Sequence, residues 1–379
     1  MALPPPVPVA LFFSQFLPGG TEGQMSELAR RLDRRRFELH VACLHRNGSW
    51  MARATEGAAS VADFPIRGFA RVGTIARMRE FASWCRERRI AVLHATDLYA
   101  NIFALPAALA AGVSVRIANR REINPDKSAG LVALQRAAYA CAHTIVANSS
   151  AARARLRQEG VSERAIAIVP NGIELSAYPV RLRADRLRRI VTVANLRAEK
   201  AHETLIDAAA LLLADHPDVE FRFAGGGARL HALRAHAERR GVAGRVHFLG
   251  HRDDVPALLG DSDIFALTSR SEACPNSVIE AMAAGLPVVA TNVGGVAELI
   301  DDRRNGVLVR PDDPQAAAAA LRELMASPDQ AAALGEAARR TVEARFSFDR
   351  MVRSFEDLYL DLLHRRAPRA APTTQLIPS

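Results

Sequence analysis

Short apolar runs alternate along most of the chain with longer stretches whose apolar residues recur at helical spacing. The run VPVALFF at residues 7–13 predicts a buried strand, followed by a glycine-rich loop and a helix that begins near Glu22. Alternating strands and helices of this kind form mostly parallel sheets with helices on both faces. Further strands of the first half are predicted at 38–44, 91–96, 113–119 and 143–148.

The same alternation starts again after Leu187, with strands predicted at 189–195, 219–225, 245–250, 263–269, 286–291 and 306–309. We therefore expect an α/β protein with two doubly wound, Rossmann-like domains. Their expected limits are 1–175 for the N-terminal domain, 176–187 for a polar linker and 188–345 for the C-terminal domain. A helix at 346–365 is expected to pack back toward the N-terminal domain, and 366–379 has the composition of a disordered tail.

The amino-acid composition is that of a soluble globular protein without a disulfide framework. With 379 residues, 49% hydrophobic and 24% charged, the chain fits a soluble globular protein and not a fibrous or disordered one. Its four cysteines lie far apart without a CxxC pair, which argues against a disulfide framework or a zinc ribbon and favours a cytoplasmic location. The apolar start lacks the basic residues of a secretory signal and is too short to span a bilayer, so neither is expected.

The positive charge lies in the first half of the chain. Residues 1–180 hold 23 Lys and Arg against 14 Asp and Glu, a net of +9, and the remainder is neutral. Five arginines gather at the end of the first predicted helix: Arg30, Arg31, Arg34, Arg35 and Arg36. They indicate either an arginine-rich composition with solvated helix faces or attraction to an anionic membrane surface or acceptor. Nucleic acid is not expected as a partner, because aromatic residues make up only 6% and no binding motif occurs.

Residues 269–295 carry the richest chemistry. A strand leads into a loop with Glu272, and a helix follows between Pro275 and Gly285, the residues that commonly open and close helices. The free N–H groups around Asn276 and Ser277 suit a phosphate. Glu280, one turn deeper, can accept hydrogen bonds from the two hydroxyls of a ribose, and Glu272 can reach the next group of a nucleotide diphosphate ligand. The alternative is a pair of solvated glutamates on a core helix.

Seven residues separate Glu272 from Glu280 inside EACPNSVIEAMAAGLPVVAT, and this segment closely resembles the signature of the retaining family 4 glycosyltransferases, also called glycosyl transferases group 1. The resemblance covers about residues 7–365. It implies the GT-B fold, in which two Rossmann-like domains face each other across a cleft. Other segments resemble family elements in the expected order: PGGTEG (18–23), VPNGIE (169–174), NLRAEKAHETLIDA (195–208), FAGGGA (223–228) and FLGHRDDVPALL (248–259).

The resemblance gives single residues roles toward a nucleotide-sugar donor. Arg197 and Lys200 match the cations that neutralise the donor diphosphate, which agrees with the charge that develops on this leaving group. Lys200 is one of only two lysines in the chain. Glu272 matches the residue that holds the sugar hydroxyls, and Glu280 the one on the ribose.

Three further positions are assigned by the same resemblance. Gly20 matches the backbone that approaches the diphosphate from the N-terminal domain, and Arg252 lies in the stretch that lines the base. Many family members carry a histidine on the donor sugar where this chain has Asn119 and Arg120, followed by Arg121, so these residues are expected to replace it. His94 reads more readily as a polar core histidine than as a catalytic one.

Two motifs are interpreted as structural. Asp261 and Asp263 form a DxD string, the metal-binding motif of a different glycosyltransferase fold, but here they precede a strand. The glycines 225–227 lack the next glycine and the acidic residue of a dinucleotide-binding loop. We therefore expect neither a metal nor another cofactor.

The sequence thus predicts a hexosyltransferase-type enzyme that moves a sugar from a nucleotide diphosphate, UDP rather than GDP, to an acceptor hydroxyl with retention of configuration. Cell-surface glycan or glycolipid synthesis is the expected setting, in the cytoplasm or on the inner face of the membrane. Two alternatives stay open: a nucleotide-sugar epimerase of the same fold, and a non-catalytic subunit that binds nucleotide-sugar.

Overall fold

The computed structural model describes residues 5–69, 71–123, 128–179 and 186–366, and the expected disordered tail lies outside them apart from Arg366. The chain forms two compact units. The first comprises residues 1–119, 127–146 and 352–379, and the second comprises residues 120–126 and 147–351. By packing, residues 147–175 therefore belong to the second unit.

A seven-stranded sheet has the strand order β3-β2-β1-β4-β5-β6-β7. Strand β1 pairs in parallel with β2 and β4, β2 with β3, and β4 with β5. Two of its strands were not predicted, because β3 and β7 are only four and three residues long and none of their residues is fully buried. The strands are β1 (Val7–Phe13), β2 (Phe37–Cys43), β3 (Ser60–Asp63), β4 (Val92–Ala95), β5 (Val115–Arg120), β6 (Thr144–Ala147) and β7 (Ile166–Ile168).

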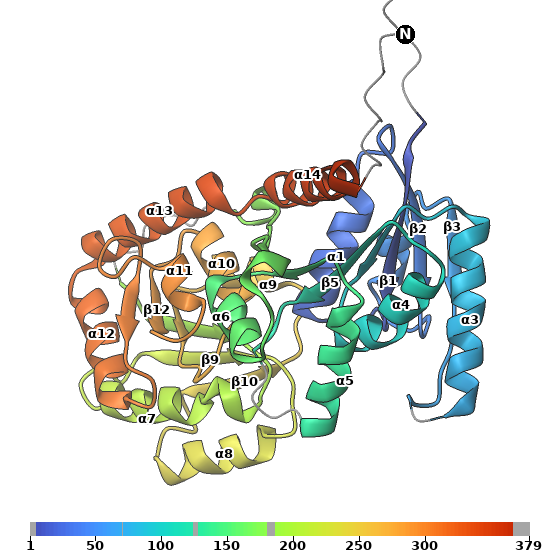
Figure 1. Ribbon diagram of the computed structural model, residues 1–379. Coiled ribbons are helices and arrows are strands. Elements are labelled where there is room, and N and C mark those ends of the chain that lie inside the picture. The colour runs from blue at the N-terminus through green and yellow to red at the C-terminus, as the bar shows by residue number, and fades with distance from the viewer. Residues whose placement is uncertain (1–4, 70, 124–127, 180–185, 367–379) are drawn as a thin grey trace, which may run out of the picture. The chain divides into compact units, whose positions relative to one another are not determined.

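Six helices, counted in the described part of residues 5–160, connect these strands (Figure 1). Helix α1 begins at Gly20, two residues before the predicted start, and its buried face carries Met25 and Leu28 against the core. The helices are α1 (Gly20–Arg31), α2 (Met51–Thr55), α3 (Val72–Glu87), α4 (Leu98–Ala110), α5 (Ala129–Ala140) and α6 (Ser150–Gln158).

The closing helix α14 (Phe348–Arg366) makes three hydrogen bonds with residues of the first hundred positions of the chain: Asp33, Arg36 and His94. The Tyr359 hydroxyl lies 2.8 Å from Nδ1 of His94, and both side chains are fully buried. Glu356 accepts a hydrogen bond from the backbone N–H of Asp33 at 2.8 Å. The hydrogen bond with Tyr359 explains how the polar side chain of His94 can be buried in the core of the first unit.

A six-stranded parallel sheet forms the centre of the second unit, in the order β10-β9-β8-β11-β12-β13. Buried residues on both of its faces pack against helices, so the prediction of two parallel-sheet, Rossmann-like α/β domains is confirmed. The strands are β8 (Arg189–Val193), β9 (Glu220–Ala224), β10 (Val246–Gly250), β11 (Ile264–Leu267), β12 (Val288–Thr291) and β13 (Val307–Val309). The helices are α7 (His202–Leu213), α8 (Leu230–Arg239), α9 (Val255–Gly260), α10 (Asn276–Ala283), α11 (Val296–Leu299), α12 (Pro314–Ala326) and α13 (Pro328–Arg345).

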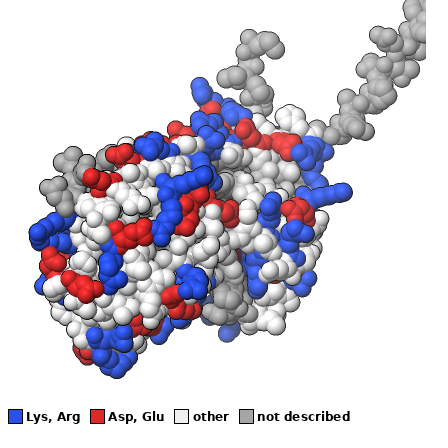
Figure 2. Space-filling view, turned by 90° about the vertical axis from the view of Figure 1, so that its left-hand side faces the viewer, with Lys and Arg blue, Asp and Glu red and all other residues white. Residues whose placement is uncertain are grey.

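The arginines of the cluster at the end of α1 form ion pairs and hydrogen bonds within the first unit. Arg30 and Arg31 pair with the carboxylate of Glu27. Arg34 donates hydrogen bonds to the carbonyls of Ala29, Leu32 and Glu56. Arg35 pairs with the carboxylate of Asp33, and Arg36 pairs with that of Glu356. Most of this charge therefore stabilises the end of a helix, as the helix dipole favours. On the face drawn in Figure 2, basic and acidic side chains are interspersed. None of the helices in the described part of the chain has the length and apolar character needed to cross a membrane.

Candidate active site

The loops that follow the strands of the second sheet carry most of the predicted site residues. Parallel strands place these loops at one edge, where ligands of doubly wound sheets bind. The loop after β8 is held by a glycine turn after β9, because the backbone N–H of Leu196 donates to the carbonyl of Gly226 at 2.9 Å. Any Cβ on Gly225 (φ 144°) would overlap the carbonyl of Ala194. The glycines therefore allow the two loops to pack backbone against backbone.

Lys200 and Glu272, 72 positions apart in the sequence, meet at this edge. The Lys200 ammonium lies 2.6 Å from Oε1 of Glu272, and the Ser269 hydroxyl donates to the same oxygen at 2.6 Å. Glu272 is 7% exposed and Ser269 fully buried. Two donors on one oxygen fix the carboxylate and leave its second oxygen available to another group.

The backbone around both residues is fixed as well. Ala201, directly after Lys200, has a left-handed conformation (φ 45°), and its carbonyl accepts a hydrogen bond from the Thr268 hydroxyl at 3.1 Å. The backbone N–H of Gly295 donates to the carbonyl of Glu272 at 3.0 Å. A Cβ on Gly294, whose φ is 51°, would overlap that same carbonyl.

Helix α10 begins and ends where the sequence indicated. Pro275 is its N-cap, and Gly285 follows the C-cap with φ 74°. Asn276 and Ser277 are the first two helical residues, and the side-chain oxygen of Asn276 accepts a hydrogen bond from the Asn171 amide. Asn171 also accepts from the buried Arg121, so the predicted VPNGIE segment supports this helix N-terminus. The N-cap residue Pro275 makes no side-chain cap hydrogen bond, and a helix N-terminus of this kind favours an anion.

Glu280 lies on α10 and is half-buried. Burial raises the pKa of its carboxyl to about 7, and a hydrogen bond from the Tyr178 hydroxyl acts in the opposite direction. Tyr178 lies in the predicted linker, and no motif in the sequence pointed to it. Its aromatic ring in a polar stretch was the available signal.

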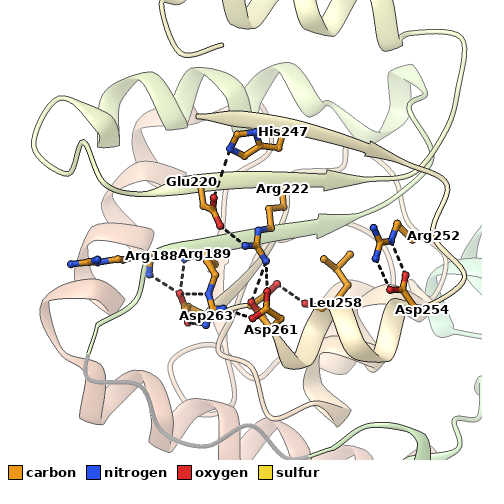
Figure 3. A network of polar contacts seen from close by, with 11 residues as sticks. Arg188, Arg189, Glu220, Arg222, His247, Arg252, Asp254, Leu258, Asp261 and Asp263 are labelled. Carbon is orange, nitrogen blue, oxygen red and sulfur yellow. Dashed lines mark hydrogen bonds and ion pairs between the residues drawn. The ribbon is translucent and has the colours of Figure 1, made fainter. Parts of the chain in front are cut away.

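Arg197 and Arg252 are more loosely placed. The Arg197 side chain is 65% exposed, and its nearest carboxylate, Glu199, is 3.9 Å away. Arg252 donates to Asp254 through Nε at 2.7 Å (Figure 3). Both residues of that pair line a pocket of about 550 Å³ beside β9, β10 and α9. An exposed cation such as Arg197 is free to turn toward a ligand.

Both aspartates of the DxD string accept hydrogen bonds from residues of the second unit (Figure 3). Asp263 is 2% exposed and accepts the backbone N–H groups of Arg188 and Arg189 at 2.8 and 2.6 Å. The Asp261 carboxylate accepts a hydrogen bond from Arg222 at 2.8 Å, which holds its pKa below the usual range. Both aspartates therefore stabilise the start of β8 and the end of α9.

The remaining predicted residues lie elsewhere. Gly20 is the first residue of α1, and Asn119 is buried in the first unit, where its amide donates to the carbonyl of Thr96 at 3.2 Å. Arg120 is 2% exposed. Its guanidinium pairs with Glu159 at 3.0 Å and donates to the carbonyl of Glu122 at 2.7 Å. Arg120 thus forms a buried ion pair of the second unit.

Comparisons with known proteins agree with this arrangement. Residues 18–177 match the family model described as Glycosyltransferase Family 4, and residues 179–341 match the one described as Glycosyl transferases group 1. The putative glycosyltransferase EpsD of Bacillus subtilis is 35% identical over 45% of this chain and 44% of its own length. D-inositol 3-phosphate glycosyltransferase of Corynebacterium urealyticum is 31% identical over 58% of this chain and 57% of its own length.

The chain spans about half the length of these curated relatives. Among solved structures, the Anabaena protein HepE in complex with UDP-glucose superimposes with a TM-score of 0.81 over 93% of this chain and 99% of that one, at 22% identity. This likeness shows the fold. The two models together account for most of the sequence, and the chain therefore belongs to the family 4 glycosyltransferases of the GT-B fold.

Proposed function

We propose that this protein transfers a sugar from UDP to an acceptor hydroxyl with retention of the anomeric configuration. The observation that carries the proposal is the contact between Lys200 and Glu272. A cation for the diphosphate and a carboxylate for the sugar have to lie side by side, because the two parts of the donor share one bond. The 2.6 Å contact between these side chains supports assigning that junction to them.

Neighbouring groups suit the rest of such a donor. The N-terminus of α10 suits a phosphate, and Glu280, on the next turn, suits the ribose hydroxyls. Arg197 would add charge at the diphosphate, and Arg252 would lie near the base. Gly20 and Asn119 stay in the proposal as contacts from the first unit, whereas Arg120 is left out because Glu159 already holds it.

The chemistry requires charge stabilisation more than proton transfer by the protein. As the bond to the sugar breaks, negative charge develops on the diphosphate, and Lys200 with the α10 N-terminus stabilises it. The acceptor attacks from the face that the leaving group vacates, and a phosphate oxygen takes up the acceptor proton. Glu272 orients the sugar through its second carboxylate oxygen.

The preference for UDP is supported by the UDP-glucose bound to the Anabaena protein. The test is to incubate the chain with a panel of UDP-sugars and GDP-sugars and to measure release of the free nucleotide. Release from UDP-sugars alone supports the proposal, and release from GDP-sugars alone contradicts its choice of base. With an acceptor found, NMR of the product must show the donor's anomeric configuration. An isomerised sugar formed from the donor alone would indicate the epimerase, and binding without turnover the non-catalytic subunit.

Removal of divalent metals is expected to leave activity unchanged. The DxD aspartates bind arginines and backbone amides, and the diphosphate charge is assigned to Lys200 and α10. Nucleotide release should be the same with and without excess EDTA. If EDTA abolished nucleotide release and manganese or magnesium restored it, Asp261 and Asp263 would be assigned to metal binding instead.

Ser269→Ala is expected to lower turnover by about 10- to 150-fold, because one hydrogen bond to a charged carboxylate is worth roughly 1.5–3 kcal/mol. UDP binding should change little, since Glu272 is assigned to the sugar and not to the nucleotide. Ser271→Ala, two positions along the same loop, is the matched control and should behave like wild type. An equal loss of UDP affinity and turnover in Ser269→Ala would assign the hydroxyl a general structural role instead.

A further inference from the structure

Arg270 joins three loops at the carboxyl edge of the second sheet. It lies in the loop after β11, and its backbone N–H donates to the carbonyl of Glu199, in the loop after β8, at 2.8 Å. Its guanidinium donates to the carbonyl of Ala198 in the same loop at 3.1 Å. Its Nε also contacts both carboxylate oxygens of Asp312, in the loop after β13, at 2.8 and 3.0 Å. One residue therefore holds two loops against the loop that carries it.

The turn that Arg270 holds is the one that carries Lys200. Residues Ala198–Lys200 form a short 3₁₀ turn. Two of its carbonyls accept the hydrogen bonds from Arg270, and the carbonyl of the next residue, Ala201, accepts the one from the Thr268 hydroxyl at 3.1 Å. The segment after β11 thus fixes the backbone on both sides of Lys200.

We propose that Arg270 is a positioning residue for Lys200 and that Asp312 holds Arg270 in this role. Lysine presents one compact charge on a flexible stem, so the place of its ammonium depends on the backbone that carries it. The planar guanidinium of arginine can bond a carboxylate and a carbonyl at the same time. Because the charge of Arg270 is already paired with Asp312, Arg270 acts through the turn and not as a further cation on the diphosphate. The inference rests on the proposed role of Lys200.

Stability alone does not account for the pair of Arg270 and Asp312. Their side chains are 46% and 53% exposed, and exposed ion pairs contribute little to folding. Asp312 has a left-handed backbone (φ 56°), which Asn and Asp adopt more readily than other residues with a side chain. The loop after β13 therefore suits a short polar side chain at the position that reaches Arg270.

A double-mutant cycle with Lys200 tests the proposal. Arg270→Ala should lower kcat for nucleotide release by about 10- to 100-fold, because a displacement of about 1 Å at a reacting group can have an effect of this size. The donor KM and the melting temperature should change little. In the Lys200→Met background, Arg270→Ala should lower kcat by less than about twofold, because two residues that act through one group are not additive. An equal loss in both backgrounds would overturn the proposal.

Two conservative variants separate position from charge. Arg270→Lys retains the charge but not the planar fork, and Asp312→Asn retains the preference for a left-handed backbone but not the carboxylate. Both should lose part of the turnover, and wild-type turnover in Arg270→Lys would overturn the proposal by assigning the effect to charge. Arg310→Ala is the matched control: it removes an arginine from the loop that carries Asp312, which pairs with Asp313 at 2.9 Å, and should behave like wild type.

Lysine NMR supplies a readout that does not depend on turnover. Lys127 and Lys200 are the only lysines of the sequence, so selective ¹³Cε labelling resolves each, and Lys127→Arg assigns them. The two Hε protons of a fixed lysine differ in chemical shift. This difference should narrow for Lys200 in Arg270→Ala and persist in Arg310→Ala, and an unchanged Lys200 signal in Arg270→Ala would overturn the proposal.

The same experiments distinguish failure of this inference from failure of the proposed function. Wild-type turnover in Lys200→Met would remove Lys200 from donor cleavage, and the inference would fall with it. A large loss in Lys200→Met together with wild-type turnover in Arg270→Ala would overturn only the positioning role.

Discussion

Lys200→Ala is expected to lower turnover by about two to three orders of magnitude while the protein stays folded. Removing one preorganised group that stabilises transition-state charge typically has this effect. Lys200 is 21% exposed at the side chain, and Glu272 beside it only 7%. The loss should appear mainly in kcat, because the diphosphate gains charge as the bond to the sugar breaks. The measurement is nucleotide release at saturating donor.

Two controls separate charge from packing at Lys200. Lys200→Met retains most of the stem and should lose as much activity as the alanine variant, whereas Lys200→Arg should retain part of it. Arg229→Ala removes another cation of the second unit, which pairs with Glu203 at 2.5 Å, and should leave turnover unchanged. Turnover near the wild-type value in both Lys200→Ala and Lys200→Met would remove the residue from the proposed mechanism.

Much of the fold follows from local patterns in the chain. Buried parallel strands are continuous apolar runs, and VPVALFF and LPVVAT needed no further context. The limits of α10 follow from Pro275 and Gly285, because each favours the backbone conformation that its position requires. The short strands β3 and β7 were missed, since their half-buried residues carry no such run.

The site could be predicted only in part. Motif order identified Lys200 and Glu272 separately, but their contact depends on how β8 and β11 lie in the sheet. The burial of Arg120 depends on Glu159, 39 positions away, and no local pattern distinguishes a buried arginine from an exposed one. The arginines after α1 gave the same difficulty, because their carboxylate and carbonyl partners are set by tertiary packing.

Donor binding is expected to weaken as the pH falls below about 7, because Glu280 must be ionised to accept hydrogen bonds from both ribose hydroxyls. Its carboxyl has a pKa of about 7 in the donor-free protein, compared with 4.5 for an ordinary glutamate, since burial disfavours the charged form. Below this pKa, the donor KM should rise by about tenfold per pH unit until it reaches the KM of the protonated form. Donor titrations between pH 5.5 and 8.5 measure the profile.

Two measurements on Glu280→Gln test the assignment of Glu280 to the ribose: the pH profile of donor binding and the melting temperature. This variant should flatten the pH profile and bind donor about as weakly as wild type does at low pH. Because the folded-state pKa is raised, the folded protein binds the proton more tightly than the unfolded chain does. The stability from this group is therefore complete below pH 4.5 and lost as the pH rises toward 7. The Tm of the glutamine variant should consequently be higher than that of the wild type at pH 8, and the two Tm values should be nearly equal at pH 4.5. An unchanged pH profile of donor binding would assign Glu280 to the core of α10 and not to the ribose.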